Sequence, residues 1–110
     1  MLEGLWTVEF RSARDSGTGV IVANDKTIAG GDSAYFYEGT YSLKNGDVHA
    51  ELDIVRFKPG AVSIFGPSNR HAVVLKGPAN SKQMNLNGHL KSNPNAEFTV
   101  HCKKERDAKF

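Results

Sequence analysis

The sequence predicts an all-β protein: a single domain over residues 1–110 that forms an antiparallel up-and-down barrel of about eight strands. Apolar and polar residues alternate with a period of two in most segments, turn-forming residues separate these segments at short intervals, and no stretch has the periodicity of a long amphipathic helix. Closing such a chain of hairpins into a barrel removes its exposed edges. Glycines inside the predicted strands, at positions 4, 19, 39 and 88, favour the barrel over a β-sandwich, the alternative architecture.

The first third of the chain contains three predicted strands. Residues 2–11 alternate, with Trp6 and Phe10 on the inner face, and residues 20–23 and 27–29 are short strands around a turn at 24–26. Residues 12–19 are a loop by composition. The Gly30-Gly31 pair permits a bulge or a sharp corner, and we expect the Asp32 carboxylate to cap the turn that follows.

A long hairpin organises the centre of the chain. The Asn45-Gly46 pair predicts a two-residue type I′ turn, because that turn needs a positive φ at both positions. The turn sets a register whose outer face places Glu38 opposite Asp53, a like-charge pair that costs stability. The inner face pairs Tyr37 with Ile54, Gly39 with Leu52, Tyr41 with Ala50 and Leu43 with Val48.

Three more strands are predicted after the turn at residues 58–60. They cover residues 71–76, 83–91 and 97–104, with turns or loops at 77–81 and 92–95. Residues 61–65 are either a short strand or part of a loop. The polar tail from residue 105 onward is expected to fray.

Charge is divided unevenly along the chain. The net charge is +2, so bulk attraction to nucleic acid is not implied, and we expect no direct nucleic-acid binding. Residues 1–57 nevertheless contain five Lys or Arg and nine Asp or Glu, whereas residues 58–110 contain nine and three. If the two halves form different sides of one barrel, an acidic and a basic flank result, which favours self-association or an electrostatically matched partner.

Composition also bears on the compartment. The N-terminal residues do not resemble a secretory leader, and the longest aliphatic run, residues 20–23, is too short to span a membrane. The single Cys102 excludes an internal disulfide and is consistent with a reducing compartment, where it is expected to be a buried side chain of the last strand. We therefore expect a cytoplasmic protein without a membrane partner.

No arrangement of residues predicts catalysis, and neither a cofactor nor a metal is expected. His89 and His101 share an outward face, but strand spacing separates them too far to ligate one metal. A candidate acidic face lies on the outside of the long hairpin. Its solvated carboxylates suit a protein partner better than acid–base chemistry. They belong to Glu38, Asp47, Glu51 and Asp53.

The inward face of the predicted barrel is rich in aromatic residues. Such residues usually form the core, but they can also line a pocket for an apolar ligand. The candidate lining residues are Trp6, Phe10, Tyr37, Tyr41, Leu52 and Leu86.

Two patterns carry a family resemblance. Gly4-Leu5-Trp6 is similar to the G-x-W motif of calycins, the lipocalin-type barrels, in which the Trp packs near a basic residue of the last strand; Lys104 matches that residue here. The second resemblance spans most of the chain and consists of Gly17-x-Gly19-Val-Ile-Val, Ile28-Ala-Gly-Gly-Asp32, Tyr37-Glu-Gly39 and Arg56-Phe57. It resembles the GrlR-like family, small cytoplasmic negative regulators of type III secretion in enteric bacteria.

The GrlR-like resemblance implies a calycin-like barrel, commonly dimeric, that sequesters a transcriptional activator and catalyses no reaction. The family's acidic activator-binding run would fall at residues 43–47, where this chain retains only Asp47, so that determinant does not carry over. The leading hypothesis is a non-enzymatic regulator that acts by protein–protein binding, with a homodimer expected. The alternative is a carrier or sensor of a small apolar ligand. An interior volume of about 300 Å³ or more would favour the ligand.

Overall fold

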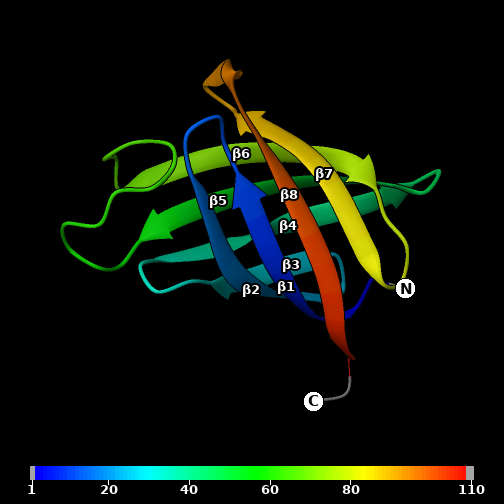
Figure 1. Ribbon diagram of the computed structural model, residues 1–110. Helices are drawn as coiled ribbons and strands as arrows, with labels where there is room; N and C mark the ends of the chain where they lie inside the picture. The colour runs from blue at the N-terminus through cyan, green and yellow to red at the C-terminus, as the bar shows by residue number, and fades with distance from the viewer. Residues whose placement is uncertain (1, 109–110) are drawn as a thin grey trace.

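The computed structural model describes residues 2–108, and within them eight strands form one closed antiparallel barrel (Figure 1). Each strand pairs with its neighbours in sequence, and the first strand pairs with the last. The up-and-down barrel predicted from the sequence is therefore confirmed, and the sandwich alternative is wrong. The strands are β1 (Gly4–Arg11), β2 (Ser16–Asn24), β3 (Thr27–Gly31), β4 (Tyr35–Lys44), β5 (Asp47–Arg56), β6 (Arg70–Pro78), β7 (Gln83–Leu90) and β8 (Asn93–Asp107).

The central hairpin has the predicted register. Asn45 and Gly46 both have positive φ, 55° and 83°, and the β4–β5 ladder places Tyr41 opposite Ala50 and Glu38 opposite Asp53. Gly39 is required at its position, because a Cβ there would lie 1.9 Å from the Glu51 carbonyl oxygen. Turn chemistry and close backbone approach thus specify the same pairing.

Two strands extend further than the local composition predicts. β2 begins at Ser16, so half of the predicted loop at residues 12–19 is strand, because Ser16 to Gly19 pair with Arg11 to Val8 of β1. Gly30 and Gly31 form no corner; they continue β3 and pair with Ile21 and Val20. Pairing with the preceding strand of the barrel thus overrides a local preference for loop or corner.

The end of the chain is also more ordered than predicted. β8 continues to Asp107, and Arg106 and Asp107 pair with Leu5 and Gly4 of β1, with a bulge between Leu5 and Trp6. The expected fraying from residue 105 is therefore wrong through Asp107; residues 109 and 110 lie outside the described residues. β6 likewise includes Gly77 and Pro78, which the sequence assigns to a loop.

The inward side chains of all eight strands share one core. Trp6, Val48, Val73 and Cys102 are the most completely buried large side chains. Leu43 is an exception to the predicted inner face, with 40% of its surface exposed, because it lies next to the hairpin turn at the end of the barrel wall. Among residues 2–108, no helix is long and apolar enough to cross a lipid bilayer.

Residues 57–69 form a long loop between β5 and β6, which extends to the left in Figure 1. The alternative of a strand at 61–65 is resolved as loop, with a single isolated bridge between Ser63 and Gly66. The Arg56 guanidinium holds the loop by donating to the carbonyl oxygen of Ala61, at 3.0 Å, and to the side chain of Asn69. The loop is thereby fixed across one end of the barrel.

Candidate functional site

The barrel encloses a cavity of about 500 Å³. This volume lies within the range typical of small-molecule sites, and most of the lining is apolar. Every strand contributes to the lining, so the cavity is the interior of the barrel itself. Representative apolar lining residues are Val8, Ile21, Ile28, Val48, Leu75, Met84, Leu86 and Val100.

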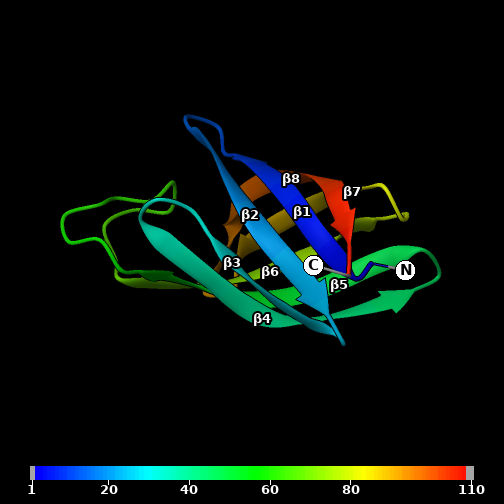
Figure 2. The ribbon, with the colours of Figure 1, turned by 90° about the horizontal axis from the view of Figure 1, so that it is seen from below.

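The cavity opens at one end of the barrel. The loops that line it are at residues 12–15, 32–34 and 57–69, and all three lie at the same end, which we call the open end. The connections at the other end, residues 25–26, 45–46 and 79–82, contribute no lining residue; we call this the closed end. Figure 2 shows the long loop and the 45–46 turn at opposite ends of the molecule. The cavity is therefore accessible from the open end.

Trp6 occupies the closed end. Its side chain is 0% exposed, its indole N–H donates to the Leu2 carbonyl oxygen at 2.8 Å, and the Lys104 ammonium lies 5.3 Å from the ring centroid. The predicted Trp–basic contact with the last strand is thus present. Trp6 does not line the cavity, however, which corrects its place in the predicted lining set; Leu2 lines it instead. The other five predicted lining residues, Phe10, Tyr37, Tyr41, Leu52 and Leu86, do line it.

An aromatic pair lies towards the open end. Phe10 and Tyr37 pack edge to face with ring centroids 6.4 Å apart. Gly17 and Gly19 of β2 leave room for them, because a Cβ at Gly17 would lie 2.5 Å from the Phe10 ring and one at Gly19 would lie 2.8 Å from the Tyr37 hydroxyl. The Gly17-x-Gly19 motif therefore shapes the wall of the cavity.

Asp32 is the central polar residue of the lining. Its Oδ1 accepts the backbone N–H groups of Ala34 and Tyr35, each at 2.9 Å, which confirms the predicted turn cap. Its Oδ2 accepts the Tyr37 hydroxyl, a contact that the sequence did not predict. Burial, and then this hydrogen bond, raise the pKa of Tyr37 above its ordinary value. Tyr37 is therefore a neutral donor at neutral pH, and Asp32 is its acceptor.

Tyr41 makes a similar contact towards the closed end. Its hydroxyl donates to Glu3 Oε2 at 3.1 Å. Burial, and secondarily the Glu3 carboxylate, raise the pKa of Tyr41 to about 12. The third phenol, that of Tyr35, donates to the Ala61 carbonyl oxygen of the long loop at 3.2 Å.

His71 is a residue that the sequence analysis did not single out. It is the buried polar residue of the described core, 7% exposed, and its Nε2 lies 3.2 Å from Ser63 Oγ of the long loop. Phe65 packs on both His71 and Phe98, with centroids 5.4 Å and 4.8 Å away. Burial lowers the pKa of His71. The alternation of His71 with Val73 and Leu75 could have placed it inward.

Cys102 is buried as predicted and lines the cavity. Burial raises the pKa of its thiol to about 12. The thiolate that reacts as a nucleophile is therefore scarce at neutral pH, and the side chain acts as a small apolar group.

Two carboxylates of the candidate acidic face, those of Asp53 and Glu51, pair with basic residues of the second half of the chain. Asp53, opposite Glu38, is bridged by Arg70 Nη2 at 2.5 Å, and Glu51 lies 3.5 Å from the Lys91 ammonium. Asp47 is paired in the ladder with Lys44 at the hairpin turn. Arg70 offsets the like-charge pair that the sequence left unexplained.

His89 and His101 lie at different levels of the β7–β8 ladder, opposite Glu97 and Asn85 respectively. His101 Nδ1 lies 2.6 Å from Asn85 Oδ1, and His101 is exposed. Within residues 2–108, no group of three or more His, Cys, Asp or Glu side chains could hold a metal ion. The cavity is consequently the feature with the clearest capacity for a ligand.

No protein-family model matches the sequence, and a search of curated proteins finds no significant match.

Proposed function

We propose that the protein binds a small, largely apolar molecule inside its barrel, as a carrier or a sensor. The observation that carries this proposal is the cavity of about 500 Å³. It exceeds the volume of about 300 Å³ above which a ligand is favoured over a barrel interior filled by side chains. The ligand is expected to enter at the open end and to contact Phe10, Tyr37 and Leu86.

Neither empty space nor water is a favourable occupant of this cavity. An empty cavity forfeits the dispersion contacts that its lining would otherwise make. Water molecules need two to four polar partners each, and the middle of the cavity, around Val48, Leu75 and Met84, is lined by apolar side chains. An apolar ligand supplies the missing contacts without requiring hydrogen bonds.

Fluorescence of N-phenyl-1-naphthylamine, an uncharged probe that emits strongly in apolar surroundings, tests the proposal. We expect saturable binding with one probe per barrel. Ala50 lines the cavity, so Ala50→Trp should fill part of it and weaken the probe by at least about tenfold, which corresponds to about 1.4 kcal/mol.

Ala72→Trp is the matched control, because Ala72 lies on the exposed face of the neighbouring strand β6. It should leave the probe affinity unchanged, with circular dichroism verifying the fold of both variants. Equal affinities in the two variants, or no saturable binding by the parent protein, would contradict the proposal.

A regulatory, protein-binding role is the second candidate. Val20 and Phe36 are 47% and 39% exposed, and they flank Gly31 in one outward row across β2, β3 and β4. This row is a suitable face for a second copy of the chain, in line with the homodimer that the GrlR-like resemblance implies. A transcriptional activator as partner, and a cytoplasmic location, rest on the sequence resemblance and composition alone.

Light scattering tests the dimer. We expect a dimer for the parent protein and a monomer for the double variant Val20→Lys, Phe36→Lys. A parent protein that is monomeric at high micromolar concentration would contradict this second candidate, while leaving ligand binding unaffected.

A further inference from the structure

We propose that the ligand of the cavity has a polar end that donates hydrogen bonds, a primary amine or an alcohol, and that carboxylates and phosphates are excluded. This inference rests on the proposed ligand-binding function and specifies its chemical class. It follows from the polar groups that line the cavity, from their hydrogen bonds, and from where the neighbouring cations point.

The lining contains no positive charge. Among the residues of 2–108 that line the cavity, none is Lys, Arg or His, whereas Asp15 and Asp32 both line it near the open end. An anionic head group entering there would lose water and approach two carboxylates without gaining a compensating cation. Both effects oppose its binding.

The phenol hydroxyls that could donate a hydrogen bond to an anion already donate to other groups of the protein. Tyr35 donates to the Ala61 carbonyl oxygen, Tyr37 to Asp32 and Tyr41 to Glu3. Ser63 is within hydrogen-bond distance of the Gly66 carbonyl oxygen, at 3.3 Å. The other lining hydroxyls, those of Ser16, Thr18 and Ser33, are exposed at the rim, where water competes for them.

Acceptor capacity remains, by contrast. A carboxylate has about four lone-pair sites, and the hydrogen bonds of Asp32 use two on Oδ1 and one on Oδ2. Asp15 accepts one local backbone N–H, from Ser16 at 2.9 Å. A donor head group can therefore add to existing interactions without displacing any of them.

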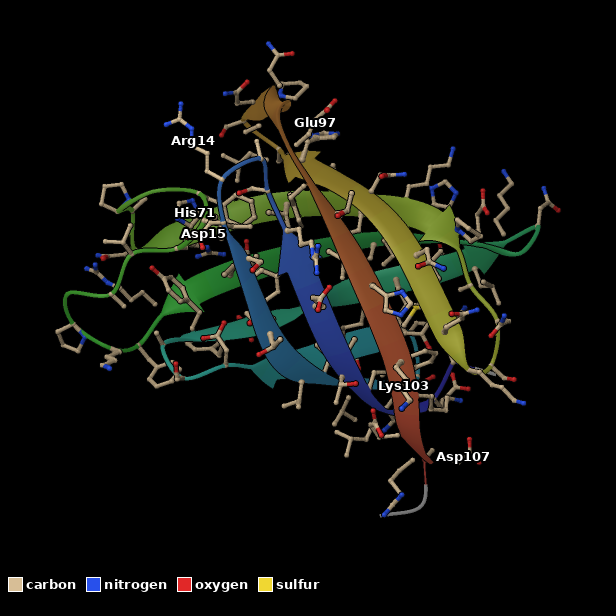
Figure 3. All side chains as sticks on the ribbon, in the orientation of Figure 1. Arg14, Asp15, His71, Glu97, Lys103 and Asp107 are labelled. Atoms are coloured by element: carbon tan, nitrogen blue, oxygen red, sulfur yellow. The ribbon has the colours of Figure 1, made fainter. Side chains whose placement is uncertain are left out.

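The cations near the open end are directed elsewhere. Arg56 donates to Ala61 and Asn69, Arg70 pairs with Asp53 on the outer wall, and Arg11 pairs with Glu9 at 3.0 Å. Arg14 lies at the tip of the β1–β2 loop and projects away from the barrel (Figure 3). Neither Arg14 nor Lys58 lines the cavity.

Competition against N-phenyl-1-naphthylamine tests the inference with three probes that share one alkyl chain: dodecylamine, dodecanol and dodecanoate, each at neutral pH and below its solubility limit or micelle-forming concentration. Dodecylamine and dodecanol should displace the fluorophore, and dodecanoate should be at least about tenfold weaker than dodecylamine. Dodecanoate that binds as tightly as the other two would overturn the inference but leave apolar-ligand binding intact. Failure of the fluorophore itself to bind would instead contradict the proposed function.

Two variants connect the preference to the open end. Dodecylamine, which is cationic at neutral pH, should bind more tightly than dodecanol beside the Asp32 carboxylate. Asp32→Asn retains an oxygen for the turn cap but removes the charge, so it should reduce that advantage by several-fold. The control is Asp25→Asn, which removes a carboxylate from a turn at the closed end and should change neither affinity. An equal effect of the two variants would contradict a specific role for Asp32.

A third variant tests the same inference without altering the turn at Asp32. Val62 lines the open end and is 65% exposed, so Val62→Lys adds a cation there at little structural cost. We expect it to strengthen dodecanoate by at least threefold and leave dodecanol unchanged. Unchanged dodecanoate affinity would show that charge at the open end does not select the ligand and would overturn the inference.

Discussion

The two ends of the barrel are built differently from the same strands. At the closed end, tight two-residue turns at 25–26 and 45–46 join strands, and Trp6 is fully buried, with its indole bonded to the Leu2 carbonyl oxygen and the Lys104 ammonium near its ring. At the open end, longer loops leave a cavity that is bordered by Asp15, Asp32 and the 57–69 loop. One end is dominated by packing and the other by polar contacts around an opening.

The different construction of the two ends implies that the closed end mainly determines stability and the open end mainly determines binding. Side chains at the closed end are closely packed, so truncating one of them leaves a void. Residues at the open end are held by individual hydrogen bonds and ring contacts, such as those of Ser63 and Phe65, whose loss affects a smaller region. Substitutions at the two ends should consequently have different dominant effects.

The largest effect is expected for Trp6→Ala. Truncating a fully buried Trp removes its packing and its hydrogen bond to Leu2, and should cost about 3–5 kcal/mol in the free energy of unfolding. Urea denaturation followed by circular dichroism measures it. A loss below about 1 kcal/mol would mean that the closed end does not stabilise the barrel.

A smaller loss of stability is expected for Phe65→Ala at the open end. Phe65 is only partly buried and contacts the rings of His71 and Phe98, so the cost should be about 1 kcal/mol. Stopped-flow fluorescence should also show faster association of the apolar probe, because the loop has lost one of its contacts with the wall. If association is unchanged while stability falls as much as in Trp6→Ala, the contrast between the ends fails.

Alkaline pH provides a graded test of Tyr41. Its folded-state pKa of about 12 lies above the value of about 10 expected for the unfolded chain. The associated stability is therefore complete below pH about 10 and is lost as the pH rises towards 12. The free energy of unfolding should decline over that interval, and it should decline less in Tyr41→Phe; Tyr37, whose pKa is also raised, accounts for part of the remaining decline. Identical pH profiles for the two proteins would rule out this role of Tyr41.

The smallest effect on stability is expected for a substitution in the barrel wall between the two ends. Arg70→Gln removes the cation that pairs with Asp53 opposite Glu38, and all three side chains are at least partly exposed. We expect a small loss of stability that becomes smaller with added salt and is reversed by a second substitution, Glu38→Gln. A loss that is independent of salt would show that Arg70 acts through packing.

Much of the fold could be predicted because it is encoded locally. Asn45-Gly46 specifies the central register, and the alternation in β1, β7 and β8 identifies the inward residues. The start of β2 at Ser16 and the extension of β8 to Asp107 could not be predicted in this way. The first depends on hairpin pairing with the neighbouring β1, and the second on pairing with β1 from the opposite end of the chain. Neither pairing is visible in local composition.

The site was less predictable than the fold. Alternation indicates which side chains point inward but not whether they fill the interior, so it identified Phe10, Tyr37 and Leu86 as candidates and wrongly included Trp6. The contact between Tyr37 and Asp32 depends on how the 32–34 turn bends over the barrel. His71 was not singled out because alternation with Val73 and Leu75 indicates only that it points inward, and a single histidine in a strand has no spacing that marks it as a site residue.

The most direct test of ligand binding is a methyl NMR titration of the whole protein with dodecanol. We predict saturable shifts for the methyl groups that face the cavity, those of Val48, Leu75, Met84 and Leu86, and none for the exposed Val20. Shifts confined to Val20 and its neighbours on the outer face, or no saturable shift at all, would contradict binding inside the barrel.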